Sequence, residues 1–417
     1  MKKINKWMKP IGITALLMAT IIVSNHVPAD AGVVDNIQNS IAAILGHTDE
    51  QAGSSFEESS TNGKLNQMKL SVDRVNSAID QMVSPYMSNL TVWVDNSNTA
   101  YNGMQVSITD SKGKVKTASY VKRNGHYEAD FSNILKGNYT ISYPYIISGK
   151  TIALSTSTTL NDSAKKQQLF GDLQQMSIAD IQACCKAGAI TSIAKVGDTF
   201  SDGTYTYTII GINQDKPSDA NGNALSSSQY GDVLTVMCLG APAGAGNGSA
   251  VTTDASKTPW GVNCAEMNSY GSNSVGWASS DIRKNILPQY FAKLPRSTQN
   301  AIGYVQKVTD NWSSGLNTTG DKCFLLSGKE IFGGTGNGNG SYCTTNEANA
   351  TFQYQYFQSI ATTPASRNFD TPTTNFWWLR SQIYGDDRNS FCCVGVGKSD
   401  GYNASSTCGV FPAFCIY

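Results

Sequence analysis

The spacing of apolar residues changes at Ser84-Pro85, and this change constrains the fold more than any other feature of the chain. Before it, apolar residues recur at alternating spacings of three and four, which makes a heptad seam on one helical face: Leu65, Met68, Val72, Val75, Ile79 and Met82. After it, Leu90, Val92 and Val94 alternate with polar residues, as in a strand with one buried face. Because the residue before a proline disfavours the helical conformation, we predict that a helix ends here and a β domain begins.

The first 31 residues have the layout of a secretory signal peptide. Lysines at positions 2, 3, 6 and 9 precede an apolar run from Ile11 to Val23, and Ala29-Asp30-Ala31 places small residues at a cleavage site. We expect cleavage after Ala31 and a secreted or cell-surface protein. An uncleaved membrane anchor is the alternative, although the run is short for a transmembrane helix.

Residues 32–86 are predicted to form a helical stalk. The apolar residues of Val33–Leu45 fall on one helical face, and the polar stretch Gly46–Gly63 is typical of a linker. Two interpretations of the Leu65–Met82 seam remain open. It packs against the Val33–Leu45 helix or the next domain, or it joins copies of the chain in a homo-oligomer.

Residues 87–160 are predicted to form a small β-sandwich, because short alternating strands follow one another at intervals of about ten residues. The expected strands are Leu90–Val94, Met104–Ile108, Val115–Val121, Tyr127–Phe131 and Tyr139–Tyr143. The stretch from Tyr101 through Asp110-Ser-Lys-Gly-Lys to Gly137-Asn-Tyr-Thr-Ile-Ser-Tyr resembles the Ig-like modules of bacterial surface proteins. The resemblance implies an Ig-like sandwich that serves as a spacer.

Composition excludes several functions. The formal net charge is zero, so the chain lacks the basic excess that nucleic-acid binding requires. The histidines are His26, His47 and His126, which excludes histidine-dependent hydrolase sites and His-ligated zinc from everything after residue 126. The glycine-rich stretches that begin at Gly240 and Gly333 are expected to be loops, because no Gly-Lys-Ser/Thr follows to bind phosphate. We therefore predict no catalytic residues, no cofactor and no enzymatic activity.

The ten cysteines all lie between Cys184 and Cys415, and none forms a C-x-x-C pair. Export permits disulfides, but the spacing fixes no pairing. Cys323 and Cys415 lie in apolar strand patterns and are predicted to be small buried hydrophobes. We predict no metal site. Asp386, Asp387 and Asp400 could supply oxygen ligands to calcium, but the sugar-calcium motifs of C-type lectins are absent, so solvated carboxylates are expected.

Residues 161–417 are predicted to form one domain, which opens with a helical pattern over Leu169–Ala187 and continues in short strands and long loops. Several patches within it resemble an exported or phage-encoded family of unknown function whose fold is similar to that of C-type lectins and the formylglycine-generating enzyme. These patches are Val196-Gly-Asp-Thr, Tyr207-Thr-Ile-Ile-Gly-Ile-Asn, Trp277-Ala-Ser-Ser-Asp-Ile-Arg, Asp321-Lys-Cys-Phe-Leu-Leu-Ser-Gly-Lys-Glu, Trp377-Trp-Leu-Arg-Ser, Phe391-Cys-Cys-Val and Gly409-Val-Phe-Pro-Ala-Phe-Cys. The resemblance implies an α+β multidomain chain with N-terminal helices, an Ig-like sandwich and a C-type-lectin-like domain of short strands, two helices and long loops.

Domains of this fold often serve as variable proteins of diversity-generating retroelements. The resemblance implies an invariant scaffold at Trp377, Trp378, Leu379, Arg380, Phe391, Val394, Gly397, Ala404, Gly409, Val410, Pro412 and Phe414. It also implies changeable, solvent-facing positions that form a ligand-binding surface. We assign this surface to Tyr384, Asp386, Asp387, Arg388, Asn389, Cys393, Ser399, Asp400, Tyr402, Asn403, Thr407 and Phe411, with Gly395 and Cys408 as further changeable positions. The family often has arginine or a small residue where Phe411 lies, so this position is either a binding residue or a locally altered core.

The composition of this segment is that of an adaptable binding surface, since aromatic rings supply contact area and small polar residues supply hydrogen bonds. Ordinary turn chemistry is the alternative for such a sequence. We predict an exported ligand-binding protein, like an adhesin or a receptor, with a protein or glycan ligand on another surface. The alternatives are a structural, pilus-like subunit and, less favoured, a copper enzyme that uses Cys392 and Cys393, although neighbouring strand residues point apart.

Overall fold

The computed structural model describes residues 61–94, 98–238, 264–269, 276–311, 315–334, 345–359, 377–383, 390–395 and 398–417. The predicted signal peptide, the Val33–Leu45 helix and the linker lie outside these residues. The chain divides into two compact units, one comprising residues up to Ser142 together with Ser157–Leu169, the other Tyr143–Thr156 together with Phe170–Tyr417. Within the described residues, no helix is both long and apolar enough to cross a membrane.

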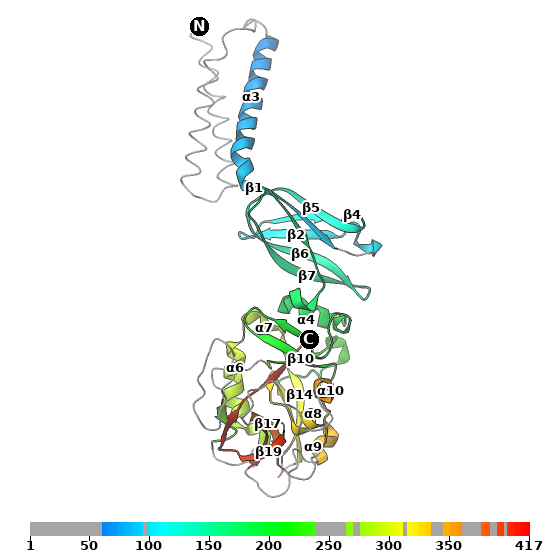
Figure 1. Cartoon of the computed structure of the whole chain (residues 1–417), viewed down its shortest axis with the longest axis vertical. Coiled ribbons are helices and arrows are strands. Elements are labelled where there is room, and N and C mark those ends of the chain that lie inside the picture. The colour runs from blue at the N-terminus through cyan, green and yellow to red at the C-terminus, as the bar shows by residue number, and fades with distance from the viewer. Residues whose placement is uncertain are drawn as a thin grey trace. The chain divides into compact units, whose positions relative to one another are not determined.

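The first unit begins with the predicted heptad helix, α3 (Thr61–Val83). A 3-10 turn, Ser84–Tyr86, follows directly, so the helix ends where the Ser-Pro pair was predicted to stop it (Figure 1). Of the seam residues, Val72 is exposed, whereas Val75, Ile79 and Met82 are half-buried.

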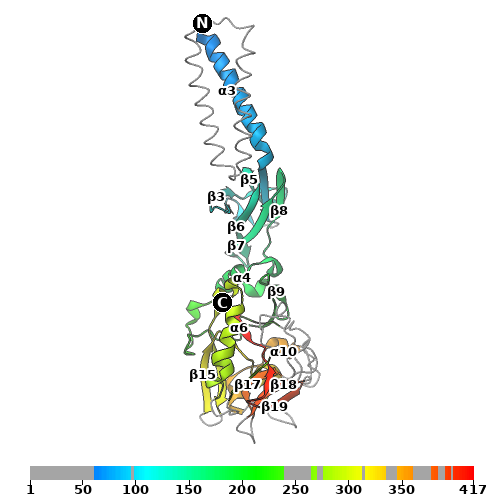
Figure 2. The ribbon, with the colours of Figure 1, turned by 90° about the vertical axis from the view of Figure 1, so that its left-hand side faces the viewer.

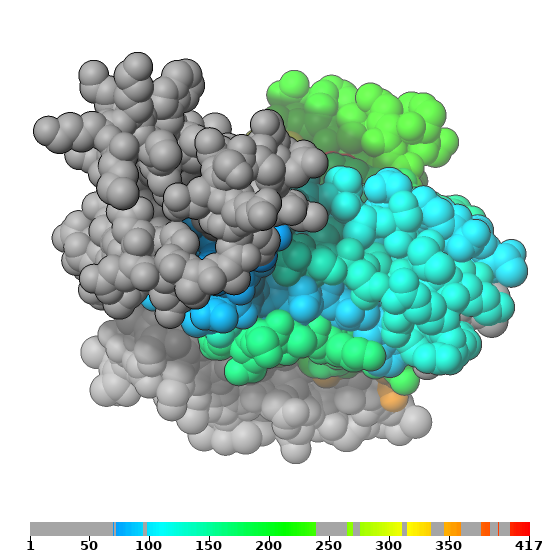
Figure 3. Space-filling model, turned by 90° about the horizontal axis from the view of Figure 1, so that it is seen from above, coloured from blue at the N-terminus to red at the C-terminus, as the bar shows by residue number. Residues whose placement is uncertain are grey.

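Eight strands follow and form two four-stranded sheets, of which only the hairpin segment Tyr143–Thr156 belongs to the second unit. One sheet has the order β4-β5-β1-β8 and the other β3-β2-β6-β7; the surface of this unit is drawn in blue and cyan in Figure 3. The strands are β1 (Met87–Val94), β2 (Gln105–Asp110), β3 (Val115–Ser119), β4 (Val121–Arg123), β5 (His126–Leu135), β6 (Gly137–Ile147), β7 (Lys150–Leu160) and β8 (Ala164–Gln168).

All five strands expected from alternation are present, but one of them is divided into two shorter strands. The expected Val115–Val121 strand is split at Tyr120, whose buried ring packs edge-on against Tyr101 with centroids 5.7 Å apart. Alternation also gives the core, since Leu90, Val92 and Val94 are all fully buried. The last strand, β8, pairs in parallel with β1, so this sheet continues beyond residue 160, where the sequence analysis placed the domain boundary.

The second unit contains three further sheets. The order of the largest is β13-β21-β11-β10-β9, with β16 also paired to β21; a second has the order β12-β20-β17-β18-β19, and β14 pairs with β15. The strands are β9 (Thr199–Ser201), β10 (Thr206–Ile212), β11 (Leu234–Met237), β12 (Cys264–Glu266), β13 (Ile302–Gly303), β14 (Val305–Asn311), β15 (Gly315–Asp321), β16 (Cys323–Phe324), β17 (Trp377–Gln382), β18 (Ser390–Gly395), β19 (Lys398–Asn403), β20 (Thr407–Gly409) and β21 (Ala413–Ile416).

The helices of this unit are short, and there are more of them than the two predicted. The expected Leu169–Ala187 helix is reduced to α4, because Ser177 and Asp180 form a capping box that starts the helix at Ile178. Helices of four to six residues are too short to show an amphipathic period, which is why the sequence did not indicate them. The helices are α4 (Ile178–Lys186), α5 (Gly276–Ser279), a π-helical turn (Ile282–Ile286), α6 (Leu287–Lys293), α7 (Arg296–Ala301), α8 (Gly328–Phe332), α9 (Thr345–Ala350) and α10 (Gln355–Ser359).

The strand nearest the end of the chain lies inside the largest sheet. All four residues of β21 are buried, and β21 pairs with β11, β13 and β16. The described chain is thus a mixture of helices and strands with strands in the majority, which agrees with the α+β expectation at that level.

Candidate functional site

The predicted scaffold lies in the sheet β12-β20-β17-β18-β19, of which Figure 2 shows β17, β18 and β19 side by side. Every residue of β17 is buried, including both tryptophans. Trp377 pairs with Val394 of β18 and with Gly409 of β20. The predicted scaffold residues whose burial is described are all buried: Trp377, Trp378, Leu379, Arg380, Phe391, Ala404, Gly409, Val410, Pro412 and Phe414.

The predicted binding residues are only partly placed. Asn403 and Thr407 are exposed, and Tyr402 is half-buried, next to the β19–β20 turn. Cys393, Ser399 and Asp400 are placed by backbone register, which sets Cys393 opposite Asp400 and Val394 opposite Ser399. The other predicted binding residues lie outside the described residues: Tyr384, Asp386, Asp387, Arg388 and Asn389.

Two of the positions assigned to the exposed surface are wrong. Phe411 is only 9% exposed and packs edge-on against Trp377, with ring centroids 5.7 Å apart, and Cys408 is 3% exposed. The cause is the path of the chain, which turns inward after Thr407 to reach β21, so that residues 408–416 are continuously buried. The alternation of buried and exposed positions holds only up to Thr407.

Asn403 combines exposure with a structural role. Its Oδ1 atom accepts hydrogen bonds from the backbone N–H of Ser405 (3.0 Å) and from the hydroxyl of Ser405 (2.8 Å). The backbone N–H of Asn268 holds the same turn through the carbonyl of Ala404, at 3.0 Å. Turn chemistry, the alternative considered above, therefore accounts for Asn403, while its exposed side chain remains accessible to a ligand.

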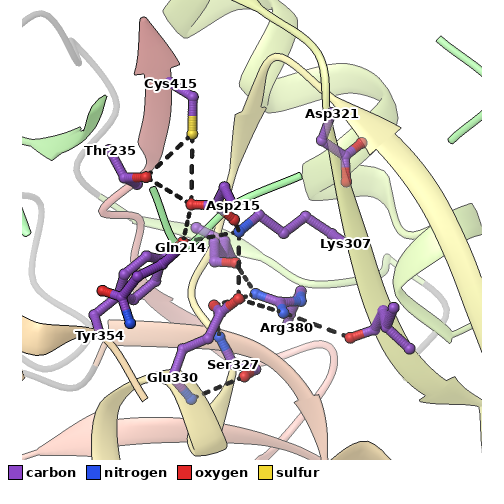
Figure 4. A network of polar contacts seen from close by, with 12 residues as sticks. Gln214, Asp215, Thr235, Lys307, Asp321, Ser327, Glu330, Tyr354, Arg380 and Cys415 are labelled. Carbon is purple, nitrogen blue, oxygen red and sulfur yellow. Dashed lines mark hydrogen bonds and ion pairs between the residues drawn. The ribbon is translucent and has the colours of Figure 1, made fainter. Parts of the chain in front are cut away.

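A network of buried charged side chains includes Arg380 of β17 (Figure 4). Arg380 of β17 forms two hydrogen bonds with Glu330 of α8, from Nη1 to Oε2 (2.5 Å) and from Nη2 to Oε1 (2.8 Å). Lys307 of β14 contacts Oε1 of Glu330 at 3.3 Å and Oδ1 of Asp215, in the loop after β10, at 2.5 Å. All four side chains are at most 1% exposed, so each charge is compensated only inside the protein.

Local structure places Glu330 in this network. Ser327 and Glu330 form a capping box at the start of α8, in which the Ser327 N–H donates to Oε2 of Glu330 (2.9 Å). The helix ends at Gly333, which adopts a left-handed conformation (φ 78°) that glycine accommodates without strain. Both ends of this five-residue helix are therefore fixed, and so is the carboxylate that it carries.

Two buried glutamates have opposite pKa shifts. Burial by itself would raise the pKa of Glu330, but the positive charges of Arg380 and Lys307 outweigh it and lower that pKa to about 2. Burial raises the pKa of Glu347 to about 7, against the charge of Arg380 and a hydrogen bond from the Ser381 hydroxyl. The network thus holds one firmly ionised carboxylate and one that titrates near neutral pH.

Sequence reasoning placed Arg380 in the scaffold but missed its partners. Ser327-x-x-Glu330 is a capping-box signature, which is a signal for Glu330, whereas Lys307 lies in the mostly polar strand Val305–Asn311 and has no comparable signal. Asp215 lies in a polar loop after a strand, and nothing in the sequence indicated that it would be buried in a charge network. Two patches that carried the family resemblance meet in a second ionic contact, where Asp321 accepts from Trp277 Nε1 (2.9 Å) and from Arg283 Nε (2.6 Å).

The first unit has a polar cleft of its own, with a cavity volume of about 360 Å³. The buried hydroxyl of Thr158 has no hydrogen-bond partner there. The residues that line it are polar in type, although their carbon atoms form much of the surface: Thr109, Asp110, Ser111, Asn138, Tyr139, Thr140, Ser157, Thr158 and Thr159. This cleft is a second place where a polar ligand would find donors and acceptors.

The described cysteine side chains lie inside the protein. Cys323 and Cys415 are buried as predicted, and so are Cys184, Cys185, Cys238 and Cys408; none of these six forms a disulfide. Burial, with the nearby charge of Asp180, raises the pKa of the Cys184 thiol to about 12, so this thiol is unreactive at neutral pH. Among the described residues, no group of three or more His, Cys, Asp and Glu side chains is arranged to hold a metal ion.

Comparison with known proteins gives little further guidance. Residues 251–417 match a family described as a domain of unknown function (DUF6273), which is less than half of the chain. No curated protein matches. A protein of Pseudomonas aeruginosa, PA1324, provisionally described as carbohydrate binding, is 15% identical with a TM-score of 0.14, over 21% of this chain and 89% of that one.

The pilus adhesin RrgA of Streptococcus pneumoniae is 14% identical with a TM-score of 0.13, over 59% of this chain and 30% of that one. At such TM-scores, neither likeness bears on the fold or the function of this chain.

Proposed function

We propose that this protein is an exported or cell-surface ligand-binding protein, like an adhesin or a receptor, whose C-terminal domain displays the binding surface. The observation that carries the proposal is the contrast within the last forty or so residues. The scaffold positions of β17 and of residues 408–416 are buried, whereas Asn403, Ser405 and Thr407 are exposed on the turn that joins β19 to β20. Loops and turns held by a rigid sheet are where binding residues usually lie.

The finer parts of the proposal rest on the sequence resemblances. The C-terminal domain would have a C-type-lectin-like fold and serve as a variable protein of a diversity-generating retroelement. The two four-stranded sheets of the first unit would be an Ig-like spacer, and the α3 seam would join copies of the chain. The signal peptide would export it, with cleavage after Ala31.

Binding is favoured over catalysis by where the described charged groups lie. Lys307, Glu330 and Arg380 are almost fully buried, and each is paired internally, which stabilises the scaffold and does not expose a reactive group. A purely structural subunit would equally need this scaffold. Such a subunit would also need Asn403 and Ser405 to hold the turn, so the preference for binding rests on the exposed Thr407 beside them and on the sequence resemblance.

The proposal is tested by changing the surface without changing the scaffold. The variant Tyr384→Ala/Arg388→Ala/Tyr402→Ala should lose binding to an array of immobilised glycans and to intact bacterial cells, with a melting temperature close to that of the unmodified protein. Trp378→Ala should instead destabilise the domain by about 3–5 kcal/mol, because it removes a fully buried ring.

If the triple variant melts much earlier, those side chains belong to the core and the site assignment is wrong. The diversification itself is tested on the flanking DNA, which should hold a reverse transcriptase gene and a near-repeat of the final coding segment. Absence of both would leave an invariant binding surface.

A further inference from the structure

Lys307 and Asp215 form a buried contact between two segments that are 92 positions apart in sequence. Nζ of Lys307 lies 2.5 Å from Oδ1 of Asp215, and each side chain is 1% exposed. The ring of Phe324 covers the amine, with its centroid 3.6 Å from Nζ. Burying an ammonium and a carboxylate together is costly, because their mutual attraction repays the lost hydration only in part.

The second oxygen of Asp215 is held by donors. Oδ2 accepts hydrogen bonds from the hydroxyls of Thr235 (2.6 Å) and Tyr354 (2.7 Å), and the thiol of Cys415 lies 3.5 Å away (Figure 4). Donors fixed on one carboxyl oxygen stabilise negative charge that develops there when the carboxyl carbon is attacked. The other oxygen faces the amine, so nucleophile, electrophile and oxyanion donors already lie together.

Glu330 completes the arrangement. Its Oε1 atom lies 3.3 Å from Nζ of Lys307, within reach of a proton that leaves the amine. Arg380 fixes this carboxylate through two hydrogen bonds and keeps it ionised. A carboxylate held in this way accepts a proton only briefly and releases it again.

We propose that Lys307 and Asp215 become joined by an intramolecular amide bond, with Glu330 as the proton acceptor. This modification is independent of the ligand-binding function proposed above. It would link the loop after β10 to β14 covalently.

The reaction is a condensation that releases one water molecule. A proton of the Lys307 ammonium moves to Oδ1 of Asp215, leaving a neutral amine and a carboxylic acid, which burial penalises less than the ion pair. The lone pair on Nζ attacks Cγ, the Nζ–Cγ bond forms, and Oδ2 takes up the negative charge. A second proton passes from Nζ through Glu330 to Oδ1. The Cγ–Oδ1 bond breaks, water leaves, and the Cγ–Oδ2 double bond re-forms, so no oxidant or other reactant is needed.

The test is the mass of the purified full-length chain after reduction and alkylation of its cysteines. We expect an intact mass lower than the sequence mass, after any signal-peptide cleavage, by one water molecule. Tryptic digestion should give one branched peptide that contains both Asp215 and Lys307, and trypsin should not cleave after Lys307. Recovery of both segments as linear peptides in full yield, with no mass deficit, would show a simple buried ion pair and overturn the proposal.

Substitutions at the two residues distinguish an amide bond from an ion pair. Lys307→Met should abolish the deficit. Asp215→Asn should give the same final mass as the unmodified protein, because the amine would then displace ammonia and form the same bond; a linear Asp215→Asn product counts against the proposal. Lys322→Met is the matched control, since Lys322 also lies over an aromatic ring, 4.9 Å from the centroid of Phe291, but outside the network. It should keep the deficit.

Glu330→Gln should slow bond formation, seen as a mixture of linear and branched forms that matures over hours in protein whose circular dichroism is unchanged. If this variant does not fold, the Asp215→Asn result decides. A deficit that maps to any other pair of residues would also overturn the proposal.

Discussion

Arg380 and Glu330 face each other across the interior of the second unit in a bidentate pair, joined by hydrogen bonds of 2.5 and 2.8 Å. The arginine comes from the Trp-Trp-Leu-Arg-Ser segment of β17 and the glutamate from the Ser-Gly-Lys-Glu segment at α8. Two stretches that carry the family resemblance thus meet as ionic partners, which gives a physical reason for the residue type at each.

Removing one member of this pair should destabilise the second unit. Arg380→Met leaves the Glu330 carboxylate buried with only Lys307 as a cationic partner, and we expect the free energy of unfolding of the second unit to fall by about 3–5 kcal/mol. Scanning calorimetry measures the effect. Arg283→Met is the comparison, because the Arg283 side chain is 22% exposed. If both variants lose the same free energy of unfolding, the fully buried Arg380 pair contributes no more to stability than the partly exposed Arg283 pair.

Stability should depend on pH through Glu347. Its pKa is about 7 in the folded protein against an ordinary value of 4.5, so the folded state binds more protons between these values. The stabilisation is complete below pH 4.5 and is lost as pH rises through 7. Because one pKa unit corresponds to about 1.4 kcal/mol, the total is on the order of 3 kcal/mol.

Glu347→Gln should remove this part of the dependence, since glutamine keeps an acceptor for Ser381 and does not ionise. Urea unfolding at pH 5, 6, 7 and 8 provides the measurement. A variant whose slope between pH 5 and 8 equals that of the unmodified protein would show that Glu347 does not titrate in this range.

Phe411 and Thr407 should respond oppositely to truncation, although both were assigned to the same surface. Phe411→Ala opens a cavity beside Trp377 and should cost about 3–5 kcal/mol of stability. Thr407→Ala changes an exposed residue and should stay within about 0.5 kcal/mol. Thermal melts of the two variants measure the difference. If Phe411→Ala is as stable as the unmodified protein, Phe411 is a surface residue after all.

The α3 seam can be tested for self-association. Val75→Asp and Ile79→Asp together put charge on the half-buried face of the helix, and a coiled-coil oligomer should dissociate to monomers in sedimentation experiments. Ser77→Asp alters an exposed position of the same helix and should leave the oligomer intact. An unmodified protein that sediments as a monomer at high concentration would rule out this route to association.

Regular periods made much of the first unit predictable. Alternation at Leu90, Val92 and Val94 gave both the strand and its buried face, and the proline at position 85 gave the end of the helix. What the period did not show was β8, since Ala164–Gln168 is mostly polar and becomes a strand only by pairing with β1. Pairing between distant segments is not written in local spacing.

The C-terminal site was less predictable for a related reason. Burial of Trp377 and Trp378 followed from their type, but burial of Phe411 depends on where the chain goes next. Lys307 and Asp215 become partners only through folds that bring together residues 92 positions apart. A charged residue in a strand shows that a partner is needed without showing which residue it is.

The place of β21 between β13 and β11 in the largest sheet also bears on how variation could be tolerated. Leu234 pairs with Ile212 on one side, but its other side pairs with Ile416, so the sheet cannot close until Ala413–Ile416 has been made. Any rewriting of residues 384–407 takes place upstream of this strand. A frameshift or a stop introduced there would remove β21 and leave β11, β13 and β16 without their shared partner. If the protein is exported and diversified as proposed, only chains read in frame to Ile416 would fold and be displayed, so folding itself would select against truncated products.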